Sequence, residues 1–169
     1  MKELAIINPE GVTEGELQGY DLREACRAVV MDNSNMLALL HVTNEKYYKL
    51  PGGGIEGNED KLSALRRECL EEIGCDVEVI SELGVVTEYR KIFGIKQISY
   101  CYLAKVKGEK GNPFFTNYEK EKGFESVWMT YKNAMKCLTE CQATSIEGGS
   151  YIVRRDTQIL EQAGLIMYK

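Results

Sequence analysis

The sequence predicts an α/β protein in which a mixed β-sheet is layered with helices. Two observations lead to this fold class. Short apolar segments rich in β-branched residues are interrupted by one amphipathic helix, and further helical segments follow the last strand. The chain has 169 residues, a normal length for one domain, and it contains no repeat, low-complexity tract or proline-rich linker. We therefore expect a single domain over residues 1–169.

The first third of the chain is predicted to supply strands. Four are expected, at residues 3–8, 26–31, 36–42 and 47–50. Residues 9–20 contain one proline and three glycines and are expected to form a loop. The turn Asp32-Asn33-Ser34-Asn35 joins the second and third strands into a hairpin.

An amphipathic helix is predicted after the segment Pro51-Gly52-Gly53-Gly54. Asn58 is the expected N-cap, and Glu59 and Asp60 suit the positive end of the helix dipole. An apolar stripe recurs at helical spacing, at Leu62, Leu65, Cys69 and Ile73. Gly74 stands where a helix commonly ends in the left-handed conformation.

The rest of the chain alternates strands and helices. Strands are expected at residues 77–89, with a break at Gly84, and at 97–106 and 124–129. A polar loop is expected at residues 107–123, and helices at 132–141 and 151–162.

Composition excludes several classes of protein. The net charge is −5 and no basic stretch stands out, so nucleic acid is not an expected partner. No apolar run approaches the roughly 18 residues that cross a membrane, and the N-terminus does not resemble a signal peptide, which favours a cytoplasmic protein. None of the six cysteines forms a CxxC pair, and His41 is the only histidine, so a zinc site or a serine–histidine hydrolase is disfavoured.

Three carboxylates of the predicted helix lie on one face. At about 100° per residue, Glu68 and Glu72 are about 40° apart, and Glu71 is about 60° from Glu68 on the other side. Like charges at this spacing destabilise a helix, and a hard divalent cation such as Mg²⁺ would offset the repulsion. The alternative is a solvated acidic face paired with Arg66 and Arg67.

The helix and its lead-in together resemble the signature of the Nudix hydrolases. Every fixed position of the box Gly-x5-Glu-x7-Arg-Glu-U-x-Glu-Glu-x-Gly-U is matched between residues 53 and 75, by Gly53, Glu59, Arg67, Glu68, Glu71, Glu72 and Gly74. A chance match at a given start is on the order of 10⁻⁸ at average residue frequencies. The two bulky positions hold the smaller Cys69 and Cys75. The upstream hairpin, the Leu-Pro-Gly-Gly lead-in and the Trp128 strand also resemble the MutT-type Nudix fold, a mixed β-sheet sandwiched between α-helices.

The resemblance implies a role for each residue of the box. Glu68 and Glu72 would be the main ligands of Mg²⁺, with Mn²⁺ as a substitute, and the carbonyl of Gly52 would complete the protein ligands. Glu71 would share that work or position the attacking water. Arg67 would orient the carboxylates and Glu59 would hold the loop against the helix, although both residues could be structural.

The general base is open between Glu71 and a glutamate of the loop 117–123, as in some relatives. In that loop Glu121 is the first candidate and Glu119 the second, and the alternative for either is a solvated charge.

The resemblance also implies a substrate class, a nucleoside diphosphate linked to another group. The markers of several subfamilies are missing, which favours a MutT-like pyrophosphohydrolase of nucleoside triphosphates. Nucleotide sugars and dinucleoside polyphosphates are alternatives, as is a non-catalytic module that senses a nucleotide or binds a partner protein. The base could stack on Tyr89, Phe93 or Trp128, although residues of this kind are more often part of the core. A monomer and a homodimer are both compatible with the sequence.

Overall fold

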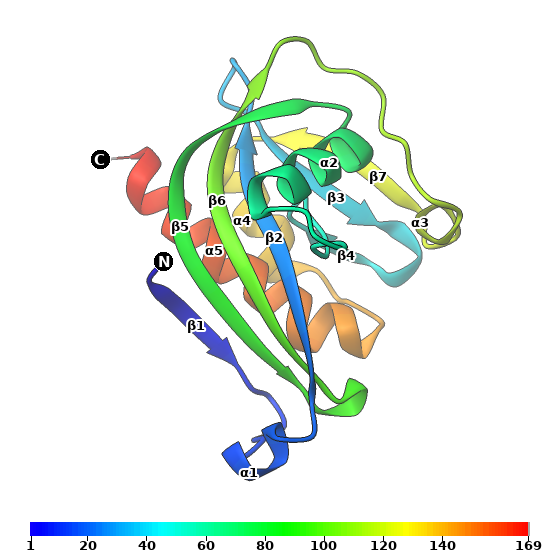
Figure 1. Cartoon of the computed structure of the whole chain (residues 1–169). Coiled ribbons are helices and arrows are strands. Elements are labelled where there is room, and N and C mark those ends of the chain that lie inside the picture. The colour runs from blue at the N-terminus through cyan, green and yellow to red at the C-terminus, as the bar shows by residue number, and fades with distance from the viewer. Residues whose placement is uncertain (169) are drawn as a thin grey trace.

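The computed structural model describes residues 1–168, and within them the strands form one seven-stranded mixed sheet (Figure 1). The strands are β1 (Glu3–Ile7), β2 (Asp21–Met31), β3 (Leu37–Val42), β4 (Tyr47–Lys49), β5 (Asp76–Arg90), β6 (Ile95–Lys107) and β7 (Phe124–Met129). The helices are α1 (Glu14–Leu17), α2 (Lys61–Ile73), α3 (Asn117–Glu121), α4 (Tyr131–Glu140) and α5 (Val153–Met167).

The sheet follows the order β1-β5-β6-β2-β3-β4, with β7 paired to β3. The β1–β5 and β2–β6 pairs are parallel, and the β5–β6, β3–β4 and β3–β7 pairs are antiparallel. Strands β2 and β3 meet at the single pair Met31 and Leu37, beside the turn that joins them. The predicted mixed sheet is therefore confirmed.

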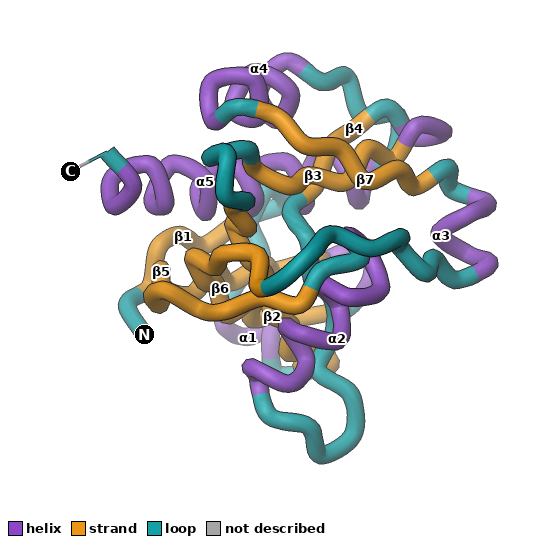
Figure 2. Tube along the Cα trace, turned by 90° about the horizontal axis from the view of Figure 1, so that it is seen from above, coloured by secondary structure: helices purple, strands orange, loops and turns teal. Residues whose placement is uncertain are grey.

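Helices cover both faces of the sheet. Figure 2 shows α4 and α5 on one side of the strands and α2 on the other. Beneath α2, the buried side chains of Leu65, Cys69 and Ile73 pack against those of Cys26 and Val30 from β2. On the opposite face, Ile159 and Leu160 of α5 pack with residues of β2, β3 and β5. The small Cys69 and Cys75 are both fully buried in the core under α2.

Several predicted boundaries are wrong. The N-cap of α2 is Asp60 instead of Asn58, because its carboxylate accepts hydrogen bonds from the backbone N–H groups of Leu62 (2.9 Å) and Ser63 (3.0 Å). Short helices, α1 and α3, lie inside both predicted loops, and strand β5 continues through Gly84 with only a shift of register. The C-terminal helix α5 follows a π-helical turn at Glu147–Ile152.

Gly74 ends α2 as predicted. It adopts the left-handed conformation (φ 66°), and its N–H donates to the carbonyl of Leu70. The segment before α3 crosses this helix end, since the N–H of Phe114 donates to the carbonyl of Glu71 (2.6 Å). No helix in residues 1–168 has the length and apolar character needed to cross a membrane.

Candidate functional site

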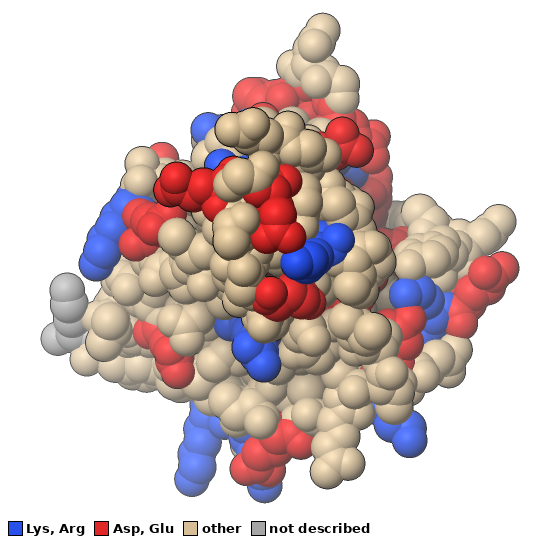
Figure 3. Space-filling view, turned by 90° about the horizontal axis from the view of Figure 1, so that it is seen from below, with Lys and Arg blue, Asp and Glu red and all other residues tan. Residues whose placement is uncertain are grey.

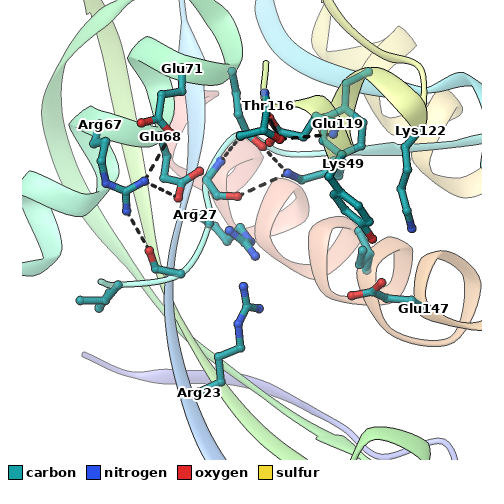
Figure 4. A pocket seen from close by; sticks show the side chains of 18 of the residues that line it. Arg23, Arg27, Lys49, Arg67, Glu68, Glu71, Thr116, Glu119, Lys122 and Glu147 are labelled. Carbon is teal, nitrogen blue, oxygen red and sulfur yellow. Dashed lines mark hydrogen bonds and ion pairs between the residues drawn. The ribbon is translucent and has the colours of Figure 1, made fainter. Parts of the chain in front are cut away.

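A cavity of about 520 Å³ opens between the polar face of α2, the glycine-rich loop, the inner face of β2, helix α3 and the start of α5 (Figure 4). Most of the residues singled out from the sequence line it, namely Gly52, Arg67, Glu68, Glu71, Glu72 and Glu119. Glu59 and Glu121 are not among the lining residues. The cavity is thus built around the carboxylate face of α2.

The glycine-rich loop runs in direct contact with β2. The backbone N–H groups of Cys26 and Ala28 donate to the carbonyls of Gly53 (2.9 Å) and Pro51 (3.1 Å). At Gly52 the backbone has φ 128°, and a Cβ there would lie only 2.1 Å from the carbonyl oxygen of Cys26. Only glycine fits this approach, which places the loop beside the carboxylates of α2.

Glu72 is the most deeply buried of the three helix carboxylates, with 2% of its surface exposed. Its Oε2 accepts a hydrogen bond from the N–H of Gly52 (2.6 Å), and its Oε1 lies 2.5 Å from the ammonium of Lys49. The same ammonium lies 3.4 Å from the carbonyl oxygen of Gly52. Lys49 therefore places one positive charge between two of the predicted metal ligands.

Arg67 connects the other carboxylates to the loop. Its guanidinium binds Glu59 through both oxygens (2.7 and 3.3 Å) and donates to the carbonyl of Gly54 (3.0 Å). The Nη1 atom also lies 2.9 Å from Glu68 and 3.3 Å from Glu71. Glu59 in turn accepts a hydrogen bond from the N–H of Glu56 (2.8 Å). Arg67 and Glu59 thus tie the loop to the helix and restrain two carboxylates.

The donor atoms suit a hard divalent cation. Carboxylate and carbonyl oxygens are the ligands that Mg²⁺ prefers, and the Lys49 ammonium already occupies a cationic position against two of them. Burial raises the pKa of Glu72 above its usual value, and the nearby charge of Glu68 adds to the effect although Lys49 opposes it. Among residues 1–168, no three His, Cys, Asp or Glu side chains converge on one point, and Lys49 and Arg67 occupy the positions beside the helix carboxylates. The oxygen donors fit such an ion. Its binding would require the Lys49 ammonium and the Arg67 guanidinium to move away from the carboxylates.

The two loop glutamates are placed differently by helix α3. Glu119 lines the cavity, and its carboxylate accepts a hydrogen bond from the N–H of Thr116 (2.7 Å), which caps the helix. Glu121 is exposed, and its backbone carbonyl accepts a hydrogen bond from the Asn44 side chain (2.7 Å). The structure thus places Glu119 in the cavity lining and Glu121 outside it, because residues two apart on a helix do not face the same side.

The aromatic side chains at the cavity are those of Tyr47, Tyr118 and Phe124. None of the three aromatic residues considered from the sequence, Tyr89, Phe93 and Trp128, is in its lining. The Trp128 ring instead lies under the ammonium of Lys110, at 3.4 Å. The side chain of His41 stacks on Tyr48 away from the cavity, and all six cysteines are free thiols.

One wall of the cavity is basic, and sequence reasoning did not anticipate it. Four arginines line it, two from β2 (Arg23 and Arg27), one from the end of β5 (Arg90) and one from α5 (Arg155). A charged residue inside the apolar run Cys26-Arg27-Ala28-Val29-Val30 is the signal that could have revealed Arg27. Lys49, beside the Leu-Pro-Gly-Gly segment, carries a similar but weaker signal.

Comparisons with known proteins agree on one family. The NUDIX domain model matches residues 21–147. Among solved structures, a NUDIX hydrolase from Nitrosomonas europaea superposes with a TM-score of 0.64 at 14% identity, covering 86% of this chain and 90% of that chain. A MutT protein from Methanosarcina mazei Go1 has a TM-score of 0.58 at 14% identity, with 86% of this chain and 96% of that chain covered.

A third solved structure, the E. coli ORF135 protein, has a TM-score of 0.56 at 16% identity, with 89% of this chain and 94% of that chain covered. At such low identity these superpositions establish a shared fold alone. The search of curated proteins gave no match.

Proposed function

This chain belongs to the Nudix hydrolase family, and we propose that it uses Mg²⁺ to cleave a phosphoanhydride bond of a nucleoside diphosphate joined to another group. The observation that carries the proposal is the carboxylate face of α2. Glu68, Glu71 and Glu72 line one cavity together with Gly52, and all of them offer oxygen donors. A nucleoside triphosphate is the favoured substrate, because the sequence lacks the markers of several other Nudix subfamilies.

The residues that would hold the cation are Glu68, Glu72 and the Gly52 carbonyl, with Glu71 as a further ligand or as the base. Such an ion, when bound, would neutralise part of the phosphate charge and lower the pKa of water. Arg67 would orient Glu68 and Glu71 from its contacts at 2.9 and 3.3 Å. Glu59 would act through Arg67 by holding that guanidinium in place.

Glu71 is our proposed general base. Its side chain is 44% exposed, whereas Glu68 and Glu72 are buried, so water reaches it most easily. Its one ion pair among residues 1–168 is with Arg67, at 3.3 Å. This is longer than the 2.9 Å contact between Arg67 and Glu68. Burial and the neighbouring Glu68 raise the pKa of Glu71, which makes its carboxylate a better proton acceptor. Glu119, across the cavity, is the second candidate.

The surface is compatible with a small substrate. On the face drawn in Figure 3, Lys and Arg side chains are interspersed with Asp and Glu, and no continuous basic surface forms there. A nucleic-acid ligand would call for clustered positive charge. A cavity of about 520 Å³ is within the usual range for small-molecule sites.

The test is hydrolysis of a panel of nucleoside triphosphates, nucleotide sugars and dinucleoside polyphosphates with Mg²⁺, followed by product analysis. We expect turnover by the wild type, loss in EDTA, and a fall in kcat of about 10²- to 10⁴-fold in Glu71→Gln if it is the base. Glu72→Gln should bind Mg²⁺ more weakly, as measured by calorimetry. Glu140→Gln, an exposed substitution of the same kind on α4, serves as the control.

Two results would contradict the proposal, namely no hydrolysis of any member of the panel, or full activity in both variants. Tight nucleotide binding without turnover and without metal dependence would instead indicate a nucleotide-binding module. Lys49 gives that alternative some support, because its ammonium could serve in place of the metal ion beside Glu72.

A further inference from the structure

Arg27 is a buried cation without a counterion. Only 4% of its surface is exposed, and no carboxylate within residues 1–168 lies within 4.0 Å of its guanidinium. The Nη1 group donates to the carbonyl of Cys26 (3.0 Å), but the buried Nε has no hydrogen-bond partner. An unpaired buried charge costs folding free energy. A bound anion would lower that cost, and residues 1–168 do not supply one.

The neighbouring guanidiniums leave a surplus of positive charge on the same wall. Arg155, fully buried, pairs with Asp156 (2.7 Å) and Glu88 (3.3 Å), yet its Nη2 has no partner. Arg90 pairs with Glu88 (2.7 Å) and Glu147 (3.0 Å). Arg23 donates to the neutral amide oxygen of Gln97. Four arginines therefore face the three carboxylates of Glu88, Glu147 and Asp156, which leaves one net positive charge.

Titration behaviour agrees with this surplus. Burial lowers the pKa of Arg27 to about 10, the charge of Arg155 adds to that effect, and the charges of Asp156 and Glu72 oppose it. Burial also lowers the pKa of Arg23, with further contributions from the positive charges of Arg90 and Arg155. The guanidiniums of Arg23, Arg27 and Arg155 thus repel one another along the cavity wall, and an anion between them would relieve the repulsion.

We propose that Arg23, Arg27 and the free Nη2 of Arg155 form an anion subsite for a phosphoryl group of the substrate. In Figure 4 the guanidinium of Arg27 lies below Glu68, and that of Arg23 lies lower still, away from Glu71. A diphosphate held at the carboxylate helix would therefore leave the arginines to a different phosphoryl group of the same molecule. The inference rests on the proposed function in one respect, namely that this cavity is the substrate pocket.

The subsite narrows the substrate class. The group joined to the nucleoside diphosphate carries a phosphoryl anion of its own, either the terminal phosphate of a nucleoside triphosphate or the phosphate of a phosphorylated sugar. A nucleotide sugar with an uncharged hexose lacks that anion. It would leave the Arg27 guanidinium and the Nη2 of Arg155 without an anionic partner, and it should be a poorer substrate.

The first experiment measures binding of inorganic phosphate to the metal-free protein in EDTA, by calorimetry and by the shift in melting temperature. We expect phosphate to stabilise the wild type and to bind about 10- to 100-fold more weakly to Arg27→Met, as loss of a charge-assisted hydrogen bond predicts. Arg27→Met should also match or exceed the wild-type melting temperature without phosphate, because an apolar side chain replaces an unpaired charge. Equal phosphate affinity in wild type and variant would overturn the proposal.

Two further variants keep the experiment decisive if Arg27→Met does not fold. Arg23→Gln alters an exposed side chain of the same subsite and should weaken phosphate binding. Arg154→Gln removes an exposed arginine of α5 that does not line the cavity, and it should bind phosphate as the wild type does. If Arg23→Gln binds phosphate normally, or Arg154→Gln loses as much affinity, no specific subsite exists.

The second experiment compares substrates in Mg²⁺. Arg27→Met should lower kcat/KM about 10- to 100-fold for whichever of two substrates the wild type prefers, a nucleoside triphosphate or a nucleoside diphosphate linked to a sugar phosphate. Activity on the matching nucleotide with an uncharged hexose should hardly change, and an equal loss on that substrate would refute the subsite. Arginine-dependent phosphate binding without any hydrolysis would refute the proposed function and leave the subsite standing.

Discussion

Gly53 offers a sharp test of how the loop and the carboxylate helix fit together. A Cβ added at Gly53 would lie 2.2 Å from Oε1 of Glu68 and 2.4 Å from its Cδ, and real Cβ atoms essentially never come within 3.0 Å of such neighbours. The three nearest atoms all belong to this one carboxylate. Gly53→Ala must therefore displace the carboxylate of Glu68, by at least the 0.8 Å that separates 2.2 from 3.0 Å.

The cost should appear in catalysis and only slightly in stability. The clash involves the end of a flexible side chain instead of backbone, so Glu68 can turn away at a cost of about 0.5–1.5 kcal/mol for a strained rotamer. A misplacement of about 1 Å at a reacting site can lower the rate about 100-fold. We thus expect Gly53→Ala to lose about 100-fold in kcat/KM with Mg²⁺ while unfolding in urea near the wild-type midpoint.

The two adjacent glycines supply the controls. In Gly52→Ala the Cβ would meet the backbone carbonyl of Cys26 at 2.1 Å with φ 128°, so the variant should lose about 2–6 kcal/mol of stability from backbone strain and overpacking. In Gly54→Ala the nearest atom, Nη2 of Arg23, is 3.4 Å away, so a much smaller loss of activity is expected than in Gly53→Ala. The reasoning is refuted if Gly53→Ala retains full activity, or if it loses as much stability as Gly52→Ala.

Two further predictions concern the cavity wall. Glu119→Gln retains the cap of α3, because glutamine can replace glutamate in a capping box, but it removes a charge from the cavity; kcat/KM should fall several-fold, whereas Glu121→Gln should behave as the wild type. A larger loss of kcat/KM in Glu121→Gln than in Glu119→Gln would contradict the choice of Glu119 as the second candidate for the general base. Burial by itself would raise the pKa of Glu88, but the guanidiniums of Arg155 and Arg90 outweigh it and hold the pKa below its usual value. The stability from Glu88 is therefore present above about pH 4.3 and is lost as the pH falls through the lower folded-state pKa, so the difference in urea midpoint between wild type and Glu88→Gln should shrink on acidification; a constant difference would contradict this.

The carboxylate face was predictable because it is local. All three carboxylates, those of Glu68, Glu71 and Glu72, lie within five consecutive positions, and helical periodicity alone places them on one face. The end of that helix at Gly74 was predictable for the same reason. Its start was not, since Asn58 and Asp60 are both good N-caps and the path of the backbone decides which of them reaches the first N–H groups.

The partners of those carboxylates depend on contacts between distant segments. Lys49 and Glu72 are 23 residues apart, and nothing in the spacing of either shows that their side chains meet at 2.5 Å. The placement of Glu119 in the cavity lining, and of Glu121 outside it, was not predictable for a related reason. Residues 107–123 look like a polar loop in the sequence, and the helix within them, which turns Glu119 to the cavity and Glu121 to solvent, is only one turn long.

The basic wall is a product of the tertiary structure alone. Strand register places Arg23 opposite Gln97, and Gln97 opposite Glu88, so three strands bring their side chains into one row. Helix α5 then adds Arg155, 67 residues beyond its partner Glu88. The sequence by itself therefore determined the family and the carboxylate face that we propose as the metal site, because these lie within one helix and its lead-in. Which cations share the cavity with that face was decided by sheet register and helix packing, because only these bring residues from β2, β5 and α5 together.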